Sequence, residues 1–494
     1  MNKTTNVLLE PPIFLHDVIN ANPGEGQCDC ACVATVPLTR TPTAVPPHTP
    51  YTLTQSFATI PVNEQYQAIV SSQIAGVVIN HSALALARHF TQPRPLVDIP
   101  AEWRRAWGET AVQNTLDQFI AHSLLVPAAA PQATLEETAT TLSAWLHITD
   151  RCNLRCDYCY LPHKREDLSW ENGRAALEGT FRSAVTHGYQ TVKLKYAGGE
   201  PLIRFPFVAE LHQYAQTLAQ QHGLALDGVV LSNGTRLTAD IIAAMQALGL
   251  RLMISLDGLG ETHDSQRIYA DGRGSFADVA RSIDLALAYG LIPDISVTVS
   301  GRSAAGLADL LVWILQRNLP FSLNFYRENE LSASRASLRL EEEQIIAGME
   351  AAFAAIEADL PQRSLLASLV DRANLSTPHQ RTCGVGHSYL VFDHHGRVSK
   401  CQMHQEQTVT TVLAEDPLAQ IRADQIGIQN LPAAEKEGCR DCQWQNWCAG
   451  GCPLATYRAT GRYDIQSPNC NIYKTLYPQA VRLEGLRLLQ QPKP

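Results

Sequence analysis

The sequence predicts an α/β protein built on a partial (β/α)6 TIM-like barrel, with a small winged-helix-like domain before it and a cysteine-rich domain after it. Two observations predict this fold. Short apolar segments alternate with amphipathic helical segments through the middle of the chain, and polar motifs follow the apolar segments. Repeated strand–helix units form parallel sheets. The 494 residues are enough for about three domains.

Six apolar segments are the expected barrel strands, at residues 144–148, 192–196, 229–231, 252–255, 295–299 and 321–325. Helical periodicity separates them, for example over residues 276–287. The first four segments are followed by Cys152 to Cys159, Gly198-Gly199-Glu200-Pro201, Ser232-Asn233-Gly234 and Ser255-Leu256-Asp257-Gly258. Barrel enzymes build their active sites at the carboxyl ends of the strands. We therefore expect these motifs to meet in one site.

Three thiols dominate the first motif. Cys152, Cys156 and Cys159 are separated by three and then two residues. Thiolates are the soft ligands of iron–sulfur clusters, and three of them can hold a cubane while leaving its fourth iron open. Zinc binding or simple burial is the alternative, but zinc usually takes four ligands from paired C-x2-C motifs. The spacing favours an iron–sulfur cluster.

This spacing, with Tyr158 before the last cysteine, resembles the cluster motif of the radical S-adenosylmethionine (SAM) superfamily. The resemblance implies a [4Fe-4S] cluster that reductively cleaves SAM to a 5′-deoxyadenosyl radical. It implies that Gly198, Gly199 and Glu200 bind SAM, that Tyr158 lies near the adenine, and that Ser255 and Arg267 contact the ribose or the carboxylate. The sequence around Arg267 and at 272–276 is similar to the branch that modifies peptides and proteins.

Seven more cysteines fill the last third of the chain, at Cys383, Cys401, Cys439, Cys442, Cys448, Cys452 and Cys470. Their G-x4-C and C-x2-C-x5-C-x3-C spacing resembles the SPASM domain of radical SAM enzymes; a zinc ribbon is the alternative. The resemblance implies two auxiliary [4Fe-4S] clusters, three clusters in all. One would be held by Cys439, Cys442, Cys448 and Cys470, the other by Cys383, Cys401 and Cys452.

The second of these sets has only three thiols. His387 or a residue from elsewhere completes it, or one iron stays open for a substrate thiolate, which is the reading we favour. His394 and His395 precede Gly396 in an expected hairpin turn. We expect both histidines to be exposed and to have no metal role.

The first 50 residues are rich in proline and are expected to form an irregular tail. Its Cys28, Cys30 and Cys32 could lend a ligand, mimic a cysteine-bearing substrate or simply be exposed, and a mobile tail favours exposure. The remaining expected divisions are a recognition domain, a linker, the barrel, connecting helices, the SPASM domain and a C-terminal helix and tail, at 51–127, 128–140, 141–335, 336–375, 376–475 and 476–494.

The domain at 51–127 is predicted to contain two strands, at 66–70 and 77–79, around a turn at Gly76. A helix capped by Asn80 or Ser82 follows, and a later helix carries Val112, Leu116, Phe119 and Ile120 on one face. The pattern resembles the PqqD-like element that enzymes of ribosomal peptide modification carry. That resemblance implies binding of a precursor peptide by strand addition; an unrelated packing domain is the alternative.

Composition restricts the function further. Thirteen cysteines, an odd number, argue against a complete disulfide framework and for metal ligation in a reducing compartment. The net charge of -9 opposes binding to nucleic acid or to an anionic membrane. Without a signal peptide or an apolar segment of spanning length, a cytoplasmic location is expected.

These features predict a radical SAM maturase of ribosomal peptides that forms a thioether or another intramolecular cross-link, with an electron donor such as a flavodoxin or ferredoxin. The first alternative is a sulfatase-maturing, formylglycine-generating enzyme. Such relatives carry an aspartate directly after the G-x4-C cysteine, where this chain has Gln402, an amide that cannot accept a proton at neutral pH. Asp393 or Glu328 could substitute for it. The second alternative is a non-catalytic iron–sulfur protein that binds peptides.

Overall fold

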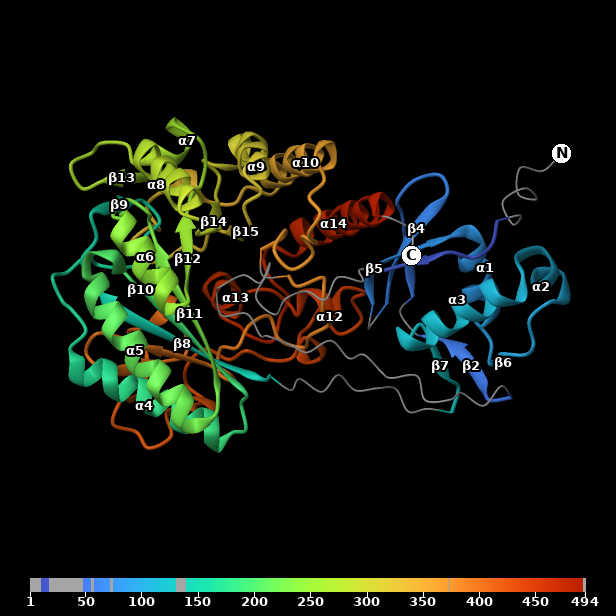
Figure 1. Ribbon diagram of the computed structural model, residues 1–494, viewed down its shortest axis with the longest axis horizontal. Helices are drawn as coiled ribbons and strands as arrows, with labels where there is room; N and C mark the ends of the chain where they lie inside the picture. Colours follow the sequence, from blue (N-terminus) through green and yellow to red (C-terminus); the bar gives the residue numbers. More distant parts are fainter. Residues whose placement is uncertain are drawn as a thin grey trace.

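The computed structural model describes residues 10–16, 48–54, 57–71, 74–129, 139–371 and 373–491. Cys28, Cys30 and Cys32, and most of the predicted linker at 128–140, lie outside the described residues. A large α/β region and a smaller N-terminal region stand at opposite ends of the molecule, and the C-terminal segments lie between them (Figure 1). In the described part of the chain, no helix is long and apolar enough to cross a bilayer.

The predicted parallel sheet is present. Six strands run parallel in chain order: β8 (Thr141–Thr149), β10 (Thr191–Gly198), β11 (Ala225–Ser232), β12 (Leu250–Ser255), β14 (Asp294–Val299) and β15 (Phe321–Phe325). Each predicted segment falls on one of them. The order and direction of the strands fit a partial (β/α)6 barrel.

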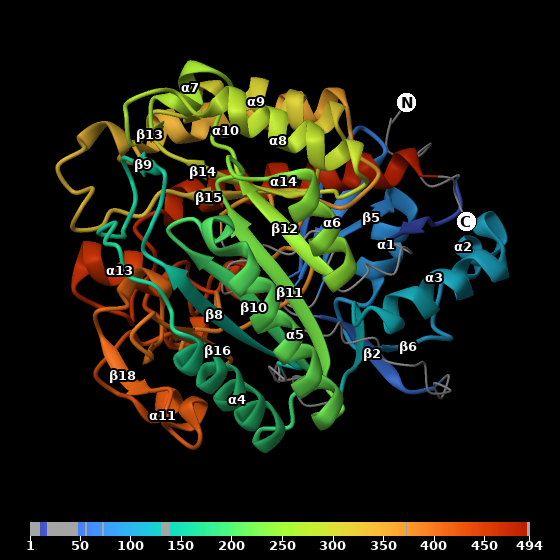
Figure 2. The ribbon, with the colours of Figure 1, turned by 60° about the vertical axis from the view of Figure 1, so that its left-hand side comes forward.

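Helices follow the strands and cover one face of the sheet (Figure 2). These helices are α4 (Trp170–Thr186), α5 (Phe205–His222), α6 (Ala239–Leu248), α8 (Phe276–Ala288) and α9 (Leu307–Gln316). Local sequence sets their ends. Ser169 caps α4 by accepting a hydrogen bond from the backbone N–H of Asn172, and Thr238 caps α6 in the same way. Gly249 ends α6 in the left-handed region, with φ at 68°.

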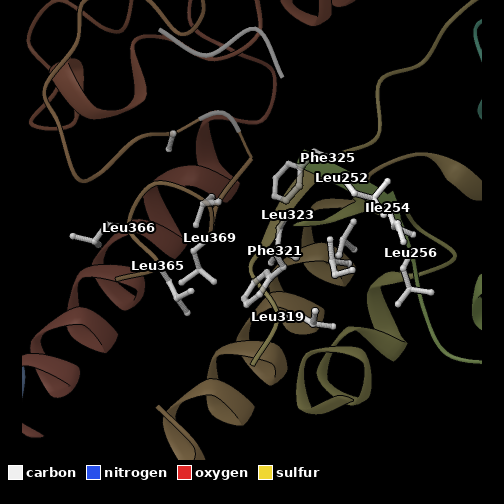
Figure 3. Close-up of a cluster of buried hydrophobic side chains, with 14 of the residues drawn as sticks. Leu252, Ile254, Leu256, Leu319, Phe321, Leu323, Phe325, Leu365, Leu366 and Leu369 are labelled. Atoms are coloured by element: carbon white, nitrogen blue, oxygen red, sulfur yellow. The ribbon is translucent and has the colours of Figure 1, made fainter. Parts of the chain in front are cut away.

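The last strand of the barrel packs against the segment that follows α10 (Glu342–Ala358). Phe321, Leu323 and Phe325 of β15 face Leu365 and Leu369, as Figure 3 shows. The backbone N–H of Leu323 also donates to the carbonyl of Ser368 at 2.9 Å. This segment therefore covers the edge of the sheet, which would otherwise present unpaired backbone groups to other chains.

At its other edge the sheet continues into the C-terminal region, which the sequence did not predict. β16 (Tyr389–Phe392) runs parallel to β8, and β17 (Arg397–Ser399) and β18 (Thr408–Thr411) follow antiparallel, so the whole sheet has nine strands. The cysteine-rich region is thus hydrogen-bonded to the strand that precedes the first cysteine motif.

The other described elements of this half are short, apart from one helix, and comprise β9 (Leu154–Cys156), α7 (Glu261–Asp264), β13 (Arg267–Tyr269), α11 (Pro417–Ala423), α12 (Gln445–Cys448), α13 (Pro453–Thr460) and α14 (Cys470–Gln490), with 3-10 turns at Pro201–Arg204, Ala304–Gly306, Ala336–Leu338, Gln402–His404 and Ala433–Glu435. The helix expected from residue 476 begins six residues earlier, at Cys470. Its first turn therefore belongs to the cysteine-rich region.

The described residues of the N-terminal region form two small sheets and three helices: β1 (Phe14–Leu15), β2 (Pro50–Leu53), β3 (Ala58–Pro61), β4 (Tyr66–Val70), β5 (Ala75–Asn80), α1 (His81–His89), β6 (Arg94–Pro95), α2 (Ala101–Trp107), α3 (Glu109–Ala121) and β7 (Leu125–Pro127). The sheets have the orders β1-β5-β4-β3 and β6-β2-β7. Val112, Leu116 and Phe119 of α3 are buried.

Two local predictions for this region are now decided. The predicted turn at Gly76 is wrong, because Gly76 lies inside β5, and the backbone N–H of Ser71 donates to the carbonyl of Ile74 at 2.8 Å before that strand begins. The Ser71 hydroxyl also accepts from the backbone N–H of Ile74 at 3.1 Å. Asn80 is the cap of α1, whereas the hydroxyl of Ser82 donates to the carbonyl of Glu10.

Candidate active site and cysteine clusters

The first three thiols lie in the loop after β8. The Sγ atom of Cys152 accepts from the backbone N–H of Leu154 at 3.4 Å and lies 3.7 Å from Asn233 Nδ2, after β11. Burial raises the pKa of Cys152 and of Cys159 to about 12. The thiols are therefore protonated without a metal, and a metal cluster must displace those protons on binding.

The glycine motif closes against the backbone in front of these cysteines. Gly198 has φ at 139°, and a Cβ there would stand 2.4 Å from the carbonyl oxygen of Thr149. A Cβ on Gly199 would stand 2.3 Å from the carbonyl oxygen of Arg151. The backbone N–H of Gly199 donates to Thr149 at 2.6 Å. The resemblance predicted that these glycines bind SAM; the structure shows that the neighbouring backbone already requires glycine at both positions.

Glu200 joins two of the loops at this edge. Its buried carboxylate accepts hydrogen bonds from the backbone N–H of Leu202 at 3.0 Å, the hydroxyl of Ser232 at 2.8 Å and the backbone N–H of Asn233 at 2.7 Å. Burial raises its pKa. The carboxylate thus orders the loops after β10 and β11, while its contact with SAM stays a prediction.

Tyr158 and Arg267 both contact the carboxylate of Asp257, a residue for which the sequence predicted no role. The Tyr158 hydroxyl donates to Asp257 Oδ2 at 2.5 Å, and Arg267 contacts the Tyr158 hydroxyl and lies 3.6 Å from the same carboxylate. The backbone N–H of Thr298 donates to Asp257 Oδ1 at 2.8 Å. Asp257 lies just after the fourth strand, and that position was the signal that could have identified it.

Arg267 also stands beside the cluster loop. It pairs with Cys156 in the antiparallel ladder of β13 and β9. Its Nε atom is buried and has no hydrogen-bond partner among the described residues. A buried guanidinium donor without a partner suits a carboxylate.

The predicted site residues therefore gather at one edge of the sheet, with Ser255 at the end of β12. Three thiols, a glycine loop and an unpartnered guanidinium donor fit an iron–sulfur cluster and a cofactor that carries a carboxylate.

Four of the C-terminal cysteines share one cavity, here called the four-thiol cavity. Cys439, Cys442, Cys448 and Cys470 line a space of about 340 Å³. Burial raises the pKa of Cys448 to about 12, and the Tyr477 hydroxyl donates to its sulfur. Trp444 and Tyr473 also line the cavity.

The other three share a second space, here called the three-thiol cavity. Cys383, Cys401 and Cys452 line a volume of about 410 Å³. The described residues that line it include Arg327, Gln402 and Met403 but neither a fourth cysteine nor His387. Because His387 is absent from the lining, its proposed role as a ligand gains no support.

The two carboxylates suggested as substitutes for an aspartate at position 402 are engaged elsewhere. Asp393 accepts from the backbone N–H and from Nε of Arg397, at 2.8 and 2.6 Å, which closes the hairpin turn. Glu328 pairs with Arg339 at 2.7 Å and is 43 % exposed. Neither is among the residues lining the three-thiol cavity, whereas Gln402 is.

The predicted exposure of the two turn histidines is half right. His395 is 51 % exposed, but His394 is only 9 % exposed. The hairpin folds back onto the loop after the cysteine motif, where His394 Nε2 lies 2.8 Å from Glu166 Oε2. The sequence shows the turn but not the surface against which it packs.

Comparison with known proteins identifies the central part of the chain. Residues 146–313 match the model of the Radical SAM superfamily. These residues form a radical SAM domain. The match contains the three cysteines of the first motif, the glycine motif and Arg267, and it confirms the prediction of this domain.

Similar proteins extend the comparison. The GTP 3′,8-cyclase of Actinobacillus pleuropneumoniae serotype 3 (strain JL03) is 31 % identical over 36 % of this chain, so the chain spans about half (51 %) of the length of that relative. The serine-type anaerobic sulfatase-maturating enzyme of Klebsiella pneumoniae is 26 % identical over 61 % of this chain and 79 % of that enzyme.

Among solved structures, native anSMEcpe with bound AdoMet and Cp18Cys peptide aligns with a TM-score of 0.57 and 17 % identity, covering 70 % of this chain and 99 % of that chain. At this identity the likeness shows the fold alone. The two relatives differ in the substrates that their names state, so the radical SAM domain by itself does not identify the substrate of this protein.

Proposed function

We propose that this protein is a radical SAM maturase that modifies a ribosomal precursor peptide and forms a thioether or another intramolecular cross-link. The observation that carries the proposal is the pair of cysteine-lined cavities in the C-terminal region, whose β16–β17 hairpin extends the sheet of the radical SAM domain. Seven thiols in two groups suit auxiliary iron–sulfur clusters, which can accept electrons during an oxidative cross-link.

In this proposal Cys152, Cys156 and Cys159 hold the first [4Fe-4S] cluster, and SAM binds beside it. Together they supply, when bound, a 5′-deoxyadenosyl radical that removes hydrogen from carbon. Arg267 Nε would donate to the carboxylate of SAM, and the Tyr158–Asp257 pair holds the guanidinium in place. The burial of these groups keeps water from the reacting centre.

The glycine motif, Ser255 and Glu200 complete the proposed SAM site. The close packing of Gly198 and Gly199 on the backbone before Cys152 fixes the distance between the SAM loop and the cluster loop. Glu200 holds the loop after β11 to the same edge.

The three-thiol cavity is the proposed place where a substrate thiolate approaches a cluster. Three cysteines leave one iron of a [4Fe-4S] cluster without a protein thiolate. Arg327 lines the same cavity, and Asp371 balances its charge at 2.8 Å. The four-thiol cavity would hold a closed cluster that passes electrons onward to or from a donor such as a flavodoxin or ferredoxin.

Residues 51–127 are proposed to be the PqqD-like, winged-helix-like recognition domain. β3 stands at the end of the β1-β5-β4-β3 sheet and pairs with β4 on one side in the described part of the chain. An edge strand of this kind can accept an extended peptide by backbone hydrogen bonds.

Sulfatase maturation is the second candidate, and the similarity to the Klebsiella pneumoniae enzyme favours it. Gln402 in the lining of the three-thiol cavity argues against it, because the two nearby carboxylates that could replace an aspartate are engaged elsewhere.

The first test is SAM cleavage by the anaerobically reconstituted protein with a reductant. Cys156→Ala should reduce release of 5′-deoxyadenosine to background, since a two-cysteine loop cannot hold the cluster. Release unchanged from wild type would show that this cluster assignment is wrong, and absence of release from the wild type would favour the non-catalytic alternative. Cys30→Ala is the matched cysteine control and should cleave SAM normally.

The second test adds peptides encoded next to the gene. A mass loss of two hydrogens would support a cross-link, whereas an aldehyde trapped by a hydrazine probe would support formylglycine formation. SAM cleavage without either product would contradict both substrate assignments.

A further inference from the structure

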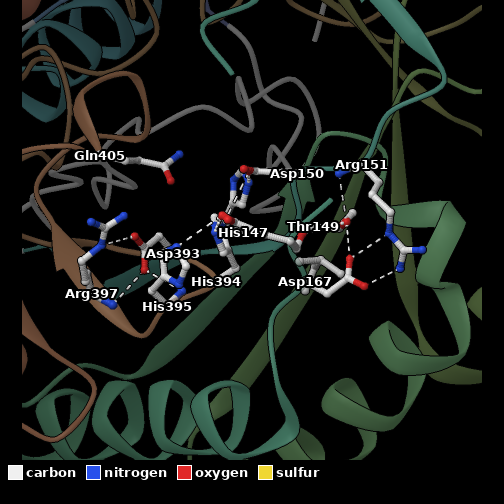
Figure 4. Close-up of polar contacts among 12 residues, drawn as sticks. His147, Thr149, Asp150, Arg151, Asp167, Asp393, His394, His395, Arg397 and Gln405 are labelled. Atoms are coloured by element: carbon white, nitrogen blue, oxygen red, sulfur yellow. Dashed lines mark hydrogen bonds and ion pairs between the residues drawn. The ribbon is translucent and has the colours of Figure 1, made fainter. Parts of the chain in front are cut away.

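Three buried side chains outside the cysteine sites converge beside the radical SAM loop. His147 is on β8, Asp150 follows β8, and His394 is in the turn between β16 and β17; their side chains are 1 %, 4 % and 9 % exposed. Figure 4 shows them pointing toward one another. One donor atom from each lies within 4.8 Å of the others. The parallel register of β8 and β16, with Leu146 opposite Phe392, brings these distant positions together.

The hydrogen bonds give the two imidazoles different roles beside Asp150. His394 Nε2 lies 2.8 Å from the Glu166 carboxylate and donates to it, so the neutral ring presents Nδ1 as an acceptor. That Nδ1 is buried, has no hydrogen-bond partner among the described residues and lies 3.7 Å from Asp150 Oδ1. His147 Nε2 is 2.6 Å from the same oxygen and donates to it, so a metal bound here would replace that proton. The ring's remaining proton would then sit on Nδ1 of His147, which is buried and has no partner among the described residues. Buried imidazole nitrogens without partners are uncommon in folded proteins.

We propose that His147, Asp150 and His394 bind a divalent transition metal of the zinc or ferrous-iron class. Two imidazoles and one carboxylate are a donor set that these ions take in proteins. Glu166 would act as the carboxylate that orients a metal-binding histidine through its other nitrogen. The ligands of a tetrahedral zinc stand roughly 3.3 Å apart, which is between the separations of 2.6 and 3.7 Å seen here.

The surrounding contacts hold the donors in place. The backbone N–H of Asp150 donates to the carbonyl of Glu166 at 2.9 Å. Thr149 donates to Asp167 at 2.5 Å, and Asp393 closes the hairpin turn through Arg397. The metal would tie the hairpin of the cysteine-rich region to the loop that carries Cys152. It would therefore join the SAM site to the region of the auxiliary cavities.

The test measures zinc in the full-length protein after its cysteines have been filled by reconstitution of the iron–sulfur clusters. We expect about one zinc per chain to survive washing with a weak chelator, and its X-ray absorption to show nitrogen or oxygen neighbours at about 2.0–2.1 Å rather than sulfur at about 2.3 Å. No retained zinc, or a sulfur shell, would overturn the proposal without the need for any variant.

Variants then locate the site. His394→Gln should bind zinc at least tenfold more weakly, and Glu166→Gln should weaken it by about 10–100-fold, the usual effect of losing such a partner. His395→Gln is the matched control, because His395 is exposed and belongs only to the neighbouring group of Glu166, His394 and His395; it should bind as wild type does. Equal binding by wild type and His394→Gln, or an equal loss in His395→Gln, would refute the site.

Discussion

The four-thiol and three-thiol cavities lie in the same region of the chain but are completed by different kinds of residue. Four cysteines line the first, which is as many as a closed cluster needs. Three cysteines line the second, where Arg327 and Gln402 also face the space. The difference teaches that the first cavity offers one thiol for each iron of a cubane, whereas the second offers one thiol fewer.

One buried carboxylate connects the two cavities. Asp371 is 1 % exposed, pairs with Arg327 of the three-thiol cavity at 2.8 Å, and accepts from Tyr473 of the four-thiol cavity at 2.6 Å. The two cavities therefore differ in the cysteines that line them, but the contacts of Asp371 connect their walls. The predictions below test how separate they are.

The largest expected effect is the loss of a whole proposed auxiliary cluster. Cys448→Ala should remove about four iron atoms per chain from the four-thiol cavity, and Cys401→Ala should remove about four from the three-thiol cavity, because each thiol is one of few ligands. Iron analysis and electron paramagnetic resonance of each variant check this. If either variant lost the signals of both sites, the cavities would not be independent.

The next effect concerns Asp371. Asp371→Asn leaves Arg327, whose side chain is 7 % exposed, without its counter-charge, and should lower the free energy of unfolding by about 3–5 kcal/mol. Urea unfolding of the cluster-loaded protein measures it. Asp271→Asn removes an exposed pair with Arg273 and should leave this free energy close to the wild-type value. Equal effects of the two variants would argue against this connection.

A smaller effect on stability is expected at the contact between Trp447, beside the four-thiol cavity, and the N-terminal region. The Trp447 indole N–H donates to the carbonyl of Ser71 at 2.9 Å, and Trp447 precedes Cys448. Trp447→Phe should lower the free energy of unfolding by about 1–2 kcal/mol, since a buried hydrogen bond is lost. Thermal unfolding should show the loss, and protease cleavage between residues 51 and 127 should become faster. Unchanged cleavage would show that this contact does not secure the N-terminal region.

The smallest effect concerns the contact of α11, in the C-terminal region, with α4 of the barrel. Asp416 caps α11 and accepts from Ser183 of α4 at 2.7 Å and from His187 at 2.8 Å. Burial alone would raise its pKa, but these hydrogen bonds outweigh burial and the pKa is lowered. The stabilisation is therefore present above the unfolded pKa of about 3.9 and is lost as the pH falls through the lower folded value.

Asp416→Asn should therefore lower the free energy of unfolding by about 1 kcal/mol at pH 7, a usual effect at a helix cap. The difference from wild type should shrink below about pH 4. A difference that stayed constant from pH 7 to pH 3 would contradict the assigned ionisation.

Local sequence patterns were sufficient to predict the radical SAM domain. The spacing of Cys152, Cys156 and Cys159 is a property of eight consecutive residues, and alternating apolar and amphipathic segments report strands and helices one at a time. The alternation therefore predicted the parallel strands, and the cysteine spacing predicted the cluster motif at the end of the first one. The prediction of a turn at Gly76 was wrong because the Ser71 hydroxyl accepts from the backbone N–H of Ile74, a contact that needs no glycine, and Gly76 lies in a strand.

The sequence by itself determined which residues can bind metal or SAM, because that depends on side-chain chemistry and short spacing. Only the tertiary structure placed β16 beside β8, buried His394 against Asp150 and Glu166, and joined the two cavities through Asp371. These contacts join residues that are far apart in the chain. Their formation depends on how complete sheets and loops pack, and no local pattern in the sequence records that packing.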